Sequence, residues 1–182
     1  IALEELLHRD ATGEVEAARA GLTGDTVLKY LFTSGSTGSP KAVINTNGMV
    51  TSNQALVRDC YRFMQTEPPV LLDWAPWNHT AAGNKVTYMV LTNGGTYYID
   101  DGKPSPDGIK ATVANLREVA CNWYFNVPAG YDLLVGELED DPELARVFFS
   151  QLKMLFYAGA GMSQNTWDRL IAVSKATTGK EI

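Results

Sequence analysis

The stretch that decides the fold is Leu31-Phe32-Thr33-Ser34-Gly35-Ser36-Thr37-Gly38-Ser39-Pro40-Lys41. It follows an apolar run, 27–32, that predicts a short buried strand, and it precedes a second apolar run, 42–45, that predicts a returning strand. Its glycines let the backbone turn and bring amide N–H groups close to a ligand. Its hydroxyl groups and the Lys41 ammonium add donors and a positive charge. This composition is typical of a loop that grips the phosphates of a nucleotide.

Two other interpretations of this loop compete with phosphate binding. The common P-loop pattern G-x-x-x-x-G-K-[ST] fails here at two positions. Counted from Gly35, the second glycine is replaced by Pro40, and Lys41 is followed by Ala42 rather than by a hydroxyl residue. A flexible Ser/Thr/Gly linker has a similar composition. A linker does not usually follow a buried strand directly or end in Pro-Lys and a further apolar run, so we favour the nucleotide loop.

Composition and charge argue against several classes of partner. The chain has 182 residues, enough for a sizeable core, and its 45% hydrophobic and 20% charged shares are those of an ordinary globular domain. A net charge of −6 without a Lys/Arg cluster argues against nucleic acid or an anionic membrane as the main partner. No run has the length of a membrane span, and no signal-peptide pattern opens the sequence. Cys60 and Cys121 fit no metal spacing and are predicted to be small buried hydrophobic residues.

Helix and strand patterns alternate along the rest of the chain. The sequence predicts a helix over 1–10, a polar surface connection over 11–26, and a helix capped by Asn47 that runs to about Gln65. Further strands are expected at 70–74, 96–99, 121–127 and 152–157, and further helices at 80–92 with a glycine cap, 107–119, 128–135, just after 140–143, and from Ser163. This alternation predicts an α/β fold, in which a mostly parallel sheet is covered by helices.

A second informative stretch is Trp74-Ala75-Pro76-Trp77-Asn78-His79-Thr80-Ala81-Ala82-Gly83. It joins a strand end to a helix start, which is where α/β proteins place their ligands. The small residues beside two tryptophans predict a cavity wall. His79 is either a neutral structural or capping histidine or a donor to negative charge in a reaction.

A third stretch, Leu152-Lys153-Met154-Leu155-Phe156-Tyr157-Ala158-Gly159-Ala160-Gly161-Met162-Ser163, runs from a predicted strand into small residues. Without side chains at Gly159 and Gly161, a flat ring could approach the backbone closely. A tight turn that needs glycine only for its geometry would explain the same residues. By contrast, the adjacent Asp100 and Asp101 lie in a Gly/Pro-rich loop, where acidic pairs are usually solvated, so no metal site is predicted there.

The first stretch, residues 32–41, resembles the signature loop of the adenylate-forming superfamily of acyl-CoA synthetases, adenylation domains and luciferases. The second and third stretches agree with this superfamily in order and spacing, although Gly161 stands where a proline is often found. The resemblance implies the fold of the N-terminal domain of these enzymes. Four further sequence segments resemble the feruloyl-CoA synthetase group; these segments are residues 41–46, 73–80, 93–96 and 99–104.

The resemblance also implies a reaction and a role for each matching residue. The reaction is ATP-dependent activation of a hydroxycinnamate-type acid to an acyl-adenylate, followed by thioester formation with coenzyme A. His79 orients the carboxylate and the α-phosphate, Ala81 helps to wall the acid, and Gly159 and Ala160 line the adenine and acyl side. Feruloyl-type relatives tend to carry an aromatic residue where this chain has Ala81. The residues expected to hold the β- and γ-phosphates are Thr33, Ser34, Gly35, Ser36, Thr37, Gly38 and Lys41, with Lys41 and His79 as the catalytic pair.

The same resemblance implies that other parts of the site lie elsewhere. Mg²⁺ would accompany ATP, but the acidic residue that the family uses for it, the ribose-binding aspartate and the lysine of the C-terminal domain fall beyond residue 182. We therefore expect residues 1–182 to be one partial domain, the central part of the AMP-binding domain of a longer cytoplasmic enzyme, and to be inactive alone. Two alternatives stay open, a fatty-acyl-CoA ligase and a non-catalytic nucleotide-binding or scaffold fragment.

Overall fold

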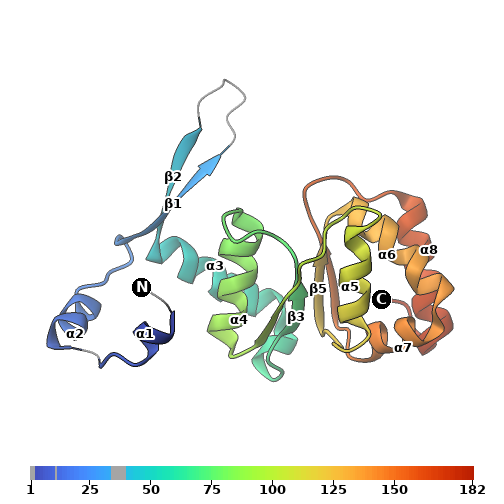
Figure 1. The fold of residues 1–182 in the computed structure, drawn as a ribbon, viewed down its shortest axis with the longest axis horizontal. Helices are drawn as coiled ribbons and strands as arrows, with labels where there is room; N and C mark the ends of the chain where they lie inside the picture. Colours follow the sequence, from blue (N-terminus) through green and yellow to red (C-terminus); the bar gives the residue numbers. More distant parts are fainter. Residues whose placement is uncertain (1–2, 11, 34–39) are drawn as a thin grey trace. The chain divides into compact units, whose positions relative to one another are not determined.

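The structure is a computed structural model that describes residues 3–10, 12–33 and 40–182 (Figure 1). The chain forms two compact units, Ile1–Ser52 and Asn53–Ile182. The first unit contains helices α1 (Leu3–Leu7) and α2 (Gly13–Ala20) and strands β1 (Val27–Thr33) and β2 (Lys41–Thr46). Helix α3 (Asn47–Cys60) begins in the first unit and ends in the second.

Helix α2 lies where the sequence predicted only a polar connection, so that prediction was wrong. The side chain of Thr12 caps the helix by accepting a hydrogen bond from the amide of Val15. Every residue of α2 is exposed, and the helix therefore carries none of the buried apolar stripe by which amphipathic helices are recognised.

Strands β1 and β2 form the predicted antiparallel hairpin, in which Thr33 stands opposite Lys41. The prediction that β1 is buried was wrong, because its side chains are mostly exposed and Phe32 retains 69% of its accessible surface. The reason is that, among the described residues, β1 pairs only with β2, and a two-stranded ribbon has no further strands beside it to cover its faces.

Helix α3 differs from its prediction at both ends. The hydroxyl of Thr46, rather than the side chain of Asn47, accepts a hydrogen bond from the amide of Met49 at 3.3 Å, which is the geometry of a helix cap. The helix ends at Cys60 instead of Gln65, and a short 3-10 helix, η1 (Arg62–Gln65), follows it.

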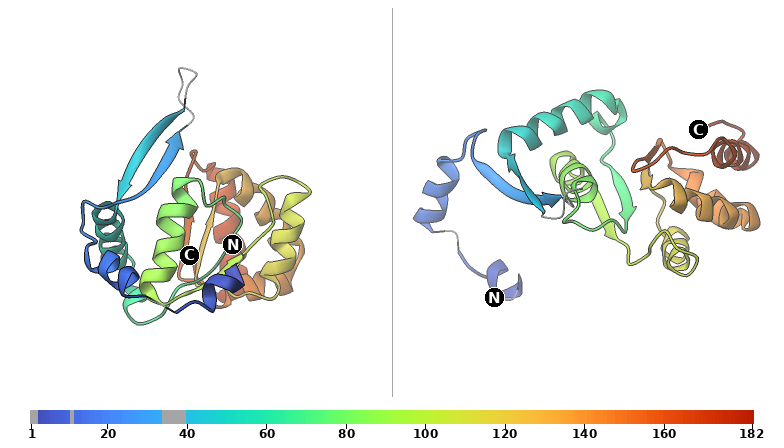
Figure 2. Two further views of the ribbon diagram at one scale, coloured as in Figure 1. Left: turned by 60° about the vertical axis from the view of Figure 1, so that its left-hand side comes forward. Right: turned by 90° about the horizontal axis from the view of Figure 1, so that it is seen from above.

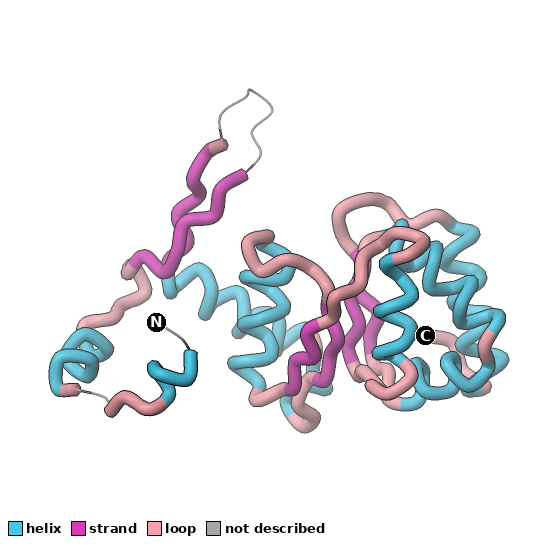
Figure 3. Tube along the Cα trace, in the orientation of Figure 1, coloured by secondary structure: helices cyan, strands magenta, loops and turns pink. Residues whose placement is uncertain are grey.

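The second unit contains four strands in two parallel pairs, visible as magenta segments in Figure 3. Strand β3 (Val70–Asp73) pairs with β4 (Thr96–Ile99), and β5 (Trp123–Asn126) pairs with β6 (Met154–Tyr157). Asn122 links the two pairs, because its amide donates to the carbonyl of Val70 and its side-chain oxygen accepts from the amide of Val70 at 2.8 Å. The predicted parallel α/β arrangement is confirmed.

The helices that follow β3 are the π-helix η2 (Ala81–Val86), α4 (Thr87–Asn93), α5 (Gly108–Leu116), α6 (Pro128–Asp140), α7 (Pro142–Ser150) and α8 (Gln164–Thr178). Helices cover both sides of the strands, with α4 on one side and α5 to α8 on the other (Figures 1 and 2). The predicted glycine cap after 80–92 and the predicted helix starts near 140–143 and at Ser163 are confirmed. Gly94 adopts φ +63° after α4, Asp141 accepts from two amides at the start of α7, and Ser163 accepts from the amide of Thr166 at the start of α8.

Strand alternation divides the buried side chains between two cores. In β5, Trp123 and Phe125 face the core beneath α3 and α4, whereas Tyr124 faces the core beneath α5 to α8. Successive side chains of a strand point to opposite faces, so one four-residue strand contributes to both cores. In the ranges that the structure describes, no helix is both long enough and apolar enough to cross a membrane.

Two predictions, one about a pair of cysteines and one about a pair of aspartates, were each right for one residue and wrong for the other. Cys121 is buried, as predicted, but Cys60 is exposed at the end of α3. Asp101 is exposed, as predicted, but Asp100 is buried and accepts hydrogen bonds from the amide of Gly102, the hydroxyl of Thr112 and the side-chain amide of Asn115. Asp100 therefore fastens its loop to α5 and is not solvated.

Candidate functional site

A pocket of about 270 Å³ lies where β3, β5 and β6 end. The carboxyl ends of parallel strands are the usual place for ligands in α/β folds. Its walls are almost wholly apolar, and His79 supplies their one ionisable side chain. The lining residues are Trp74, Ala75, Pro76, His79, Ala81, Phe125, Val127, Ala158 and Gly159.

His79 stands exposed at the edge of this pocket, in a turn closed by a hydrogen bond from its own amide to the carbonyl of Pro76. Its Nδ1 accepts a hydrogen bond from the amide of Ala81 at 3.2 Å. In a neutral imidazole one ring nitrogen accepts and the other carries the proton. The contact with Ala81 therefore leaves Nε2–H as a donor, which suits a role toward a carboxylate or phosphate oxygen.

The helix predicted at 80–92 starts as the π-helix η2, which begins two residues after His79. π-Helical turns are rare and often mark functional sites. Here the side-chain amide of Gln54 donates to the carbonyls of Asn84 and Lys85, at 3.2 and 3.5 Å, and so supports the wider turn.

Asn126 organises the β5 side of the pocket, a role that sequence reasoning did not assign. Its side-chain oxygen accepts hydrogen bonds from the indole of Trp74 at 3.2 Å and from the amide of Val127 at 2.9 Å, and both of these residues line the pocket. Its side-chain nitrogen donates to the hydroxyl of Tyr124. The only available sequence signal was an amide residue that ends an apolar strand before proline.

Asp73 and Tyr97 form a second polar group that the sequence did not reveal. Asp73 ends β3 and is only 2% exposed, and its Oδ2 accepts a hydrogen bond from the hydroxyl of Tyr97 at 3.1 Å. Burial raises the pKa of Asp73 to about 6, although hydrogen bonds from Ala75 and Tyr97 act in the opposite direction. Burial, and then the charge of Asp73, raise the pKa of Tyr97 above its ordinary range.

Gly159 and Ala160 have different places in the structure. Gly159 lines the pocket and adopts φ +95°, a left-handed conformation that favours glycine, so turn geometry alone requires it. Ala160 is exposed and is not among the residues that line the pocket. The structure thus brings His79, Ala81 and Gly159 together in the lining of one pocket, and Ala160 does not line it.

The predicted phosphate loop belongs to the first unit, and most of it, Ser34 to Gly38, lies outside the described residues. Its two described ends are Thr33 and Lys41. Both are exposed, and the hydroxyl of Thr33 donates to the carbonyl of Lys41 at 3.4 Å. The predicted joint role of Lys41 and His79 stays a prediction.

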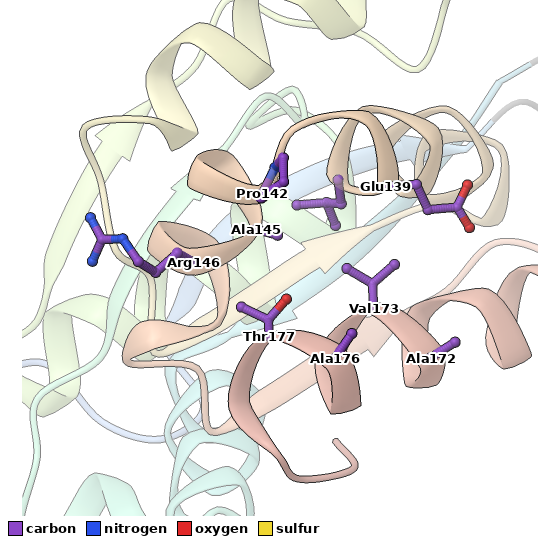
Figure 4. A pocket seen from close by; sticks show the side chains of 9 residues that line it. Glu139, Pro142, Ala145, Arg146, Ala172, Val173, Ala176 and Thr177 are labelled. Atoms are coloured by element: carbon purple, nitrogen blue, oxygen red, sulfur yellow. The ribbon is translucent and has the colours of Figure 1, made fainter.

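A larger pocket, of about 540 Å³, lies among α6, α7 and α8 (Figure 4). It contains none of the predicted site residues. Small and apolar side chains from α8, including Ala172 and Ala176, face Pro142 and Ala145 across it, and Arg146 stands at its edge. Nothing in its chemistry points to catalysis.

An α/β unit with an apolar pocket at the carboxyl ends of parallel strands, and a histidine at the pocket's edge, is typical of α/β proteins that bind small molecules. Comparison with known proteins narrows this class. The chain belongs to the AMP-binding enzyme family, because the family model matches residues 2–179. The predicted membership of the adenylate-forming superfamily is confirmed.

Individual relatives agree with this family. The chain is 29% identical, over 143 residues, to an acetyl-coenzyme A synthetase of Alcanivorax borkumensis, a match that covers 78% of this chain and 21% of the relative. The chain thus spans about a fifth of the length of the curated relative. The narrower resemblance to feruloyl-CoA synthetases stays a prediction.

Solved structures of similar fold are also found among known proteins. A malonyl-CoA ligase with methylmalonyl-CoA and AMP bound has a TM-score of 0.71 and 22% identity, over 89% of this chain and 33% of that chain. A structure of McyG A-PCP complexed with phenylalanyl-adenylate has a TM-score of 0.70 and 22% identity, and the match covers 88% of this chain and 28% of that chain. These likenesses establish the fold of the N-terminal domain of adenylate-forming enzymes.

Proposed function

We propose that the full-length protein activates a carboxylic acid with ATP to give an acyl-adenylate and then transfers the acyl group to coenzyme A. Membership of the AMP-binding family supports the reaction class. The observation that carries the proposal for this chain is the convergence of His79, Ala81 and Gly159 on one apolar pocket at the strand ends.

In the proposed first step, a carboxylate oxygen attacks the α-phosphorus of ATP and pyrophosphate leaves. The hydroxyl-rich loop from Thr33 to Lys41 would hold the departing phosphates. His79 would donate from Nε2 to the oxygens that gain charge, so its contribution is positioning and electrostatic stabilisation. The second step breaks the acyl–phosphate bond, as the coenzyme A thiol takes the acyl group and AMP leaves.

The acid itself is proposed to have an apolar, aromatic body of the hydroxycinnamate type. Two aromatic side chains, Trp74 and Phe125, line the pocket, and Ala81 leaves space where a larger residue would fill it. Planar walls suit a planar substrate, because aromatic rings favour offset stacking and edge contacts. A medium-chain fatty acid would also find an apolar wall, and the assay below separates the two classes.

Magnesium is expected to arrive with the phosphates of ATP rather than at a preformed site in this chain. Among the residues that the structure describes, no group of three or more His, Cys, Asp or Glu side chains could hold a metal ion. The described residues therefore do not fit a magnesium centre of their own, and we assign no step to one.

The test is acid-dependent exchange of pyrophosphate into ATP by the full-length protein, with ferulate, p-coumarate, benzoate and a medium-chain fatty acid compared. We expect the fastest exchange with the hydroxycinnamates and a loss of about a hundredfold in His79→Ala. His8→Ala, which replaces an exposed histidine of the first unit, is the matched control and should behave as wild type. Lys41→Ala should weaken ATP binding.

Other outcomes redirect the proposal. Exchange with the fatty acid alone would move the protein to a fatty-acyl-CoA ligase. No exchange with any of the four acids by a folded protein would overturn the catalytic function and favour a nucleotide-binding scaffold.

A further inference from the structure

The turn that carries His79 is attached to the sheet through one buried carboxylate. Asp73 is the last residue of β3, and its Oδ1 accepts a hydrogen bond from the amide of Ala75 at 3.0 Å. Ala75 lines the pocket, so this bond fixes the backbone at the point where the strand becomes the pocket wall. A carboxylate that bonds to the amide two residues on is a common way to set such a turn.

The other oxygen of Asp73 begins a chain of hydrogen bonds that returns to the same turn. Oδ2 accepts from the hydroxyl of Tyr97, on the neighbouring strand β4, at 3.1 Å. That hydroxyl in turn accepts from the indole Nε1–H of Trp77 at 3.1 Å. The rings of Trp77 and Tyr97 are stacked, with centroids 6.0 Å apart and an interplanar angle of 24°.

Trp77 lies two residues before His79 and within the turn closed by the bond from His79 to Pro76. The turn is therefore held at its start by Asp73, in its middle by Tyr97 through Trp77, and at its end by the bond from Ala81 to the imidazole. Trp77 is 53% exposed, so burial alone does not hold it in place.

We infer that Asp73 and Tyr97 are positioning residues, which fix the turn from Pro76 to His79 so that the imidazole faces the pocket. This inference rests on the proposed function, because it assigns a purpose to residues that the proposed reaction does not touch. It goes beyond that function by naming side chains outside the pocket that act through His79.

The electrostatics of Asp73 support a functional reason for keeping it. No described Lys, Arg or His forms an ion pair with Asp73, and the nearby charge of Asp100 is of the same sign. Burial raises the pKa of Asp73 to about 6, so ionisation of this carboxyl at neutral pH lowers the stability of the folded protein. Groups kept in such a state beside a pocket are frequently functional.

Tyr97→Phe in the full-length protein tests the inference, because it removes the shared hydroxyl and keeps the ring. The matched control is Tyr98→Phe, since Tyr98 is the next residue of β4, faces the opposite side and is 44% exposed. Trp77→Phe is a second variant, which removes the Nε1 donor from an exposed side chain without disturbing the core.

The first readout is hydrogen exchange of the backbone amides in a peptide that spans residues 74–81. Tyr97→Phe and Trp77→Phe should exchange about tenfold faster there than wild type, the effect of one lost hydrogen bond on local opening. Tyr98→Phe should not differ from wild type. Equal exchange in all four proteins would overturn the inference, whatever the protein catalyses.

The second readout is the kinetics of pyrophosphate exchange. A misplaced imidazole should lower kcat about tenfold in Tyr97→Phe and leave the KM for the acid within about twofold, whereas a deformed pocket would raise that KM. If wild type exchanges pyrophosphate and Tyr97→Phe keeps its kcat, the inference fails and the proposed function stands. If wild type exchanges none, the proposed function fails, and hydrogen exchange alone decides whether the turn is held in this way.

Discussion

Asp73→Asn should change how the stability of the protein depends on pH. The pKa of Asp73 rises from 3.8 to about 6 in the folded protein, chiefly because the carboxyl is buried. Between these two values the folded state binds a proton that the unfolded state has released, so stability falls as pH rises. A pKa difference of about 2 corresponds to a free-energy difference of about 3 kcal/mol, because each tenfold change in an equilibrium constant is worth about 1.4 kcal/mol.

The sign follows from the direction of the shift. The stabilising contribution of protonated Asp73 is complete below pH 4 and is lost by about pH 6, where the carboxylate ionises inside the protein. Asparagine cannot ionise, so wild type should lose about 3 kcal/mol relative to Asp73→Asn between pH 4 and pH 7.

Urea unfolding of both proteins, followed by tryptophan fluorescence at intervals from pH 4 to pH 8, measures this difference. The hydrogen bonds changed by the substitution add an offset that does not vary with pH, and all other titrating groups are shared by both proteins. Parallel curves across this range would refute the claim that burial controls the ionisation of Asp73.

Two further predictions compare neighbouring residues. Gly130→Ala should destabilise the protein by about 2 kcal/mol or more, because a Cβ there would lie 2.1 Å from the side-chain oxygen of Asn126. In the same helix, a Cβ at Gly136 would meet no atom closer than 3.8 Å, so Gly136→Ala should stabilise the protein by about 0.5–1 kcal/mol. The denaturant midpoints of the two variants and wild type measure both changes. Asp100→Ala should cost about 2–4 kcal/mol, because it leaves two buried donors, on Gly102 and Thr112, and the partly buried donor of Asn115 without their acceptor. The exposed Asp101→Ala should change stability by less than about 0.5 kcal/mol, and equal losses for the two would show that Asp100 does not fasten its loop.

Properties that depend on a few adjacent residues were predicted correctly from the sequence. The glycine cap after α4 and the start of a helix at Ser163 follow from local backbone chemistry. The hairpin around the hydroxyl-rich loop and the parallel alternation of strands and helices follow from apolar periodicity and turn residues. The structure places Gly159, from the third stretch, in the lining of the same pocket as His79, whereas the roles that the resemblance implies for both residues stay predictions.

Burial and long-range polar contacts were decided by the tertiary structure. The strand β1 is as apolar in sequence as β5, yet β1 is mostly exposed and β5 is buried, because only β5 lies in a sheet covered on both faces. Tyr97 meets Asp73 across 24 positions of sequence, and Trp74 meets Asn126 across 52. No local pattern specifies such pairs, since they form only when packed strands bring distant residues together. The sequence by itself therefore determined most of the elements and the family of this protein, and only the tertiary structure determined which side chains hold His79 at the pocket.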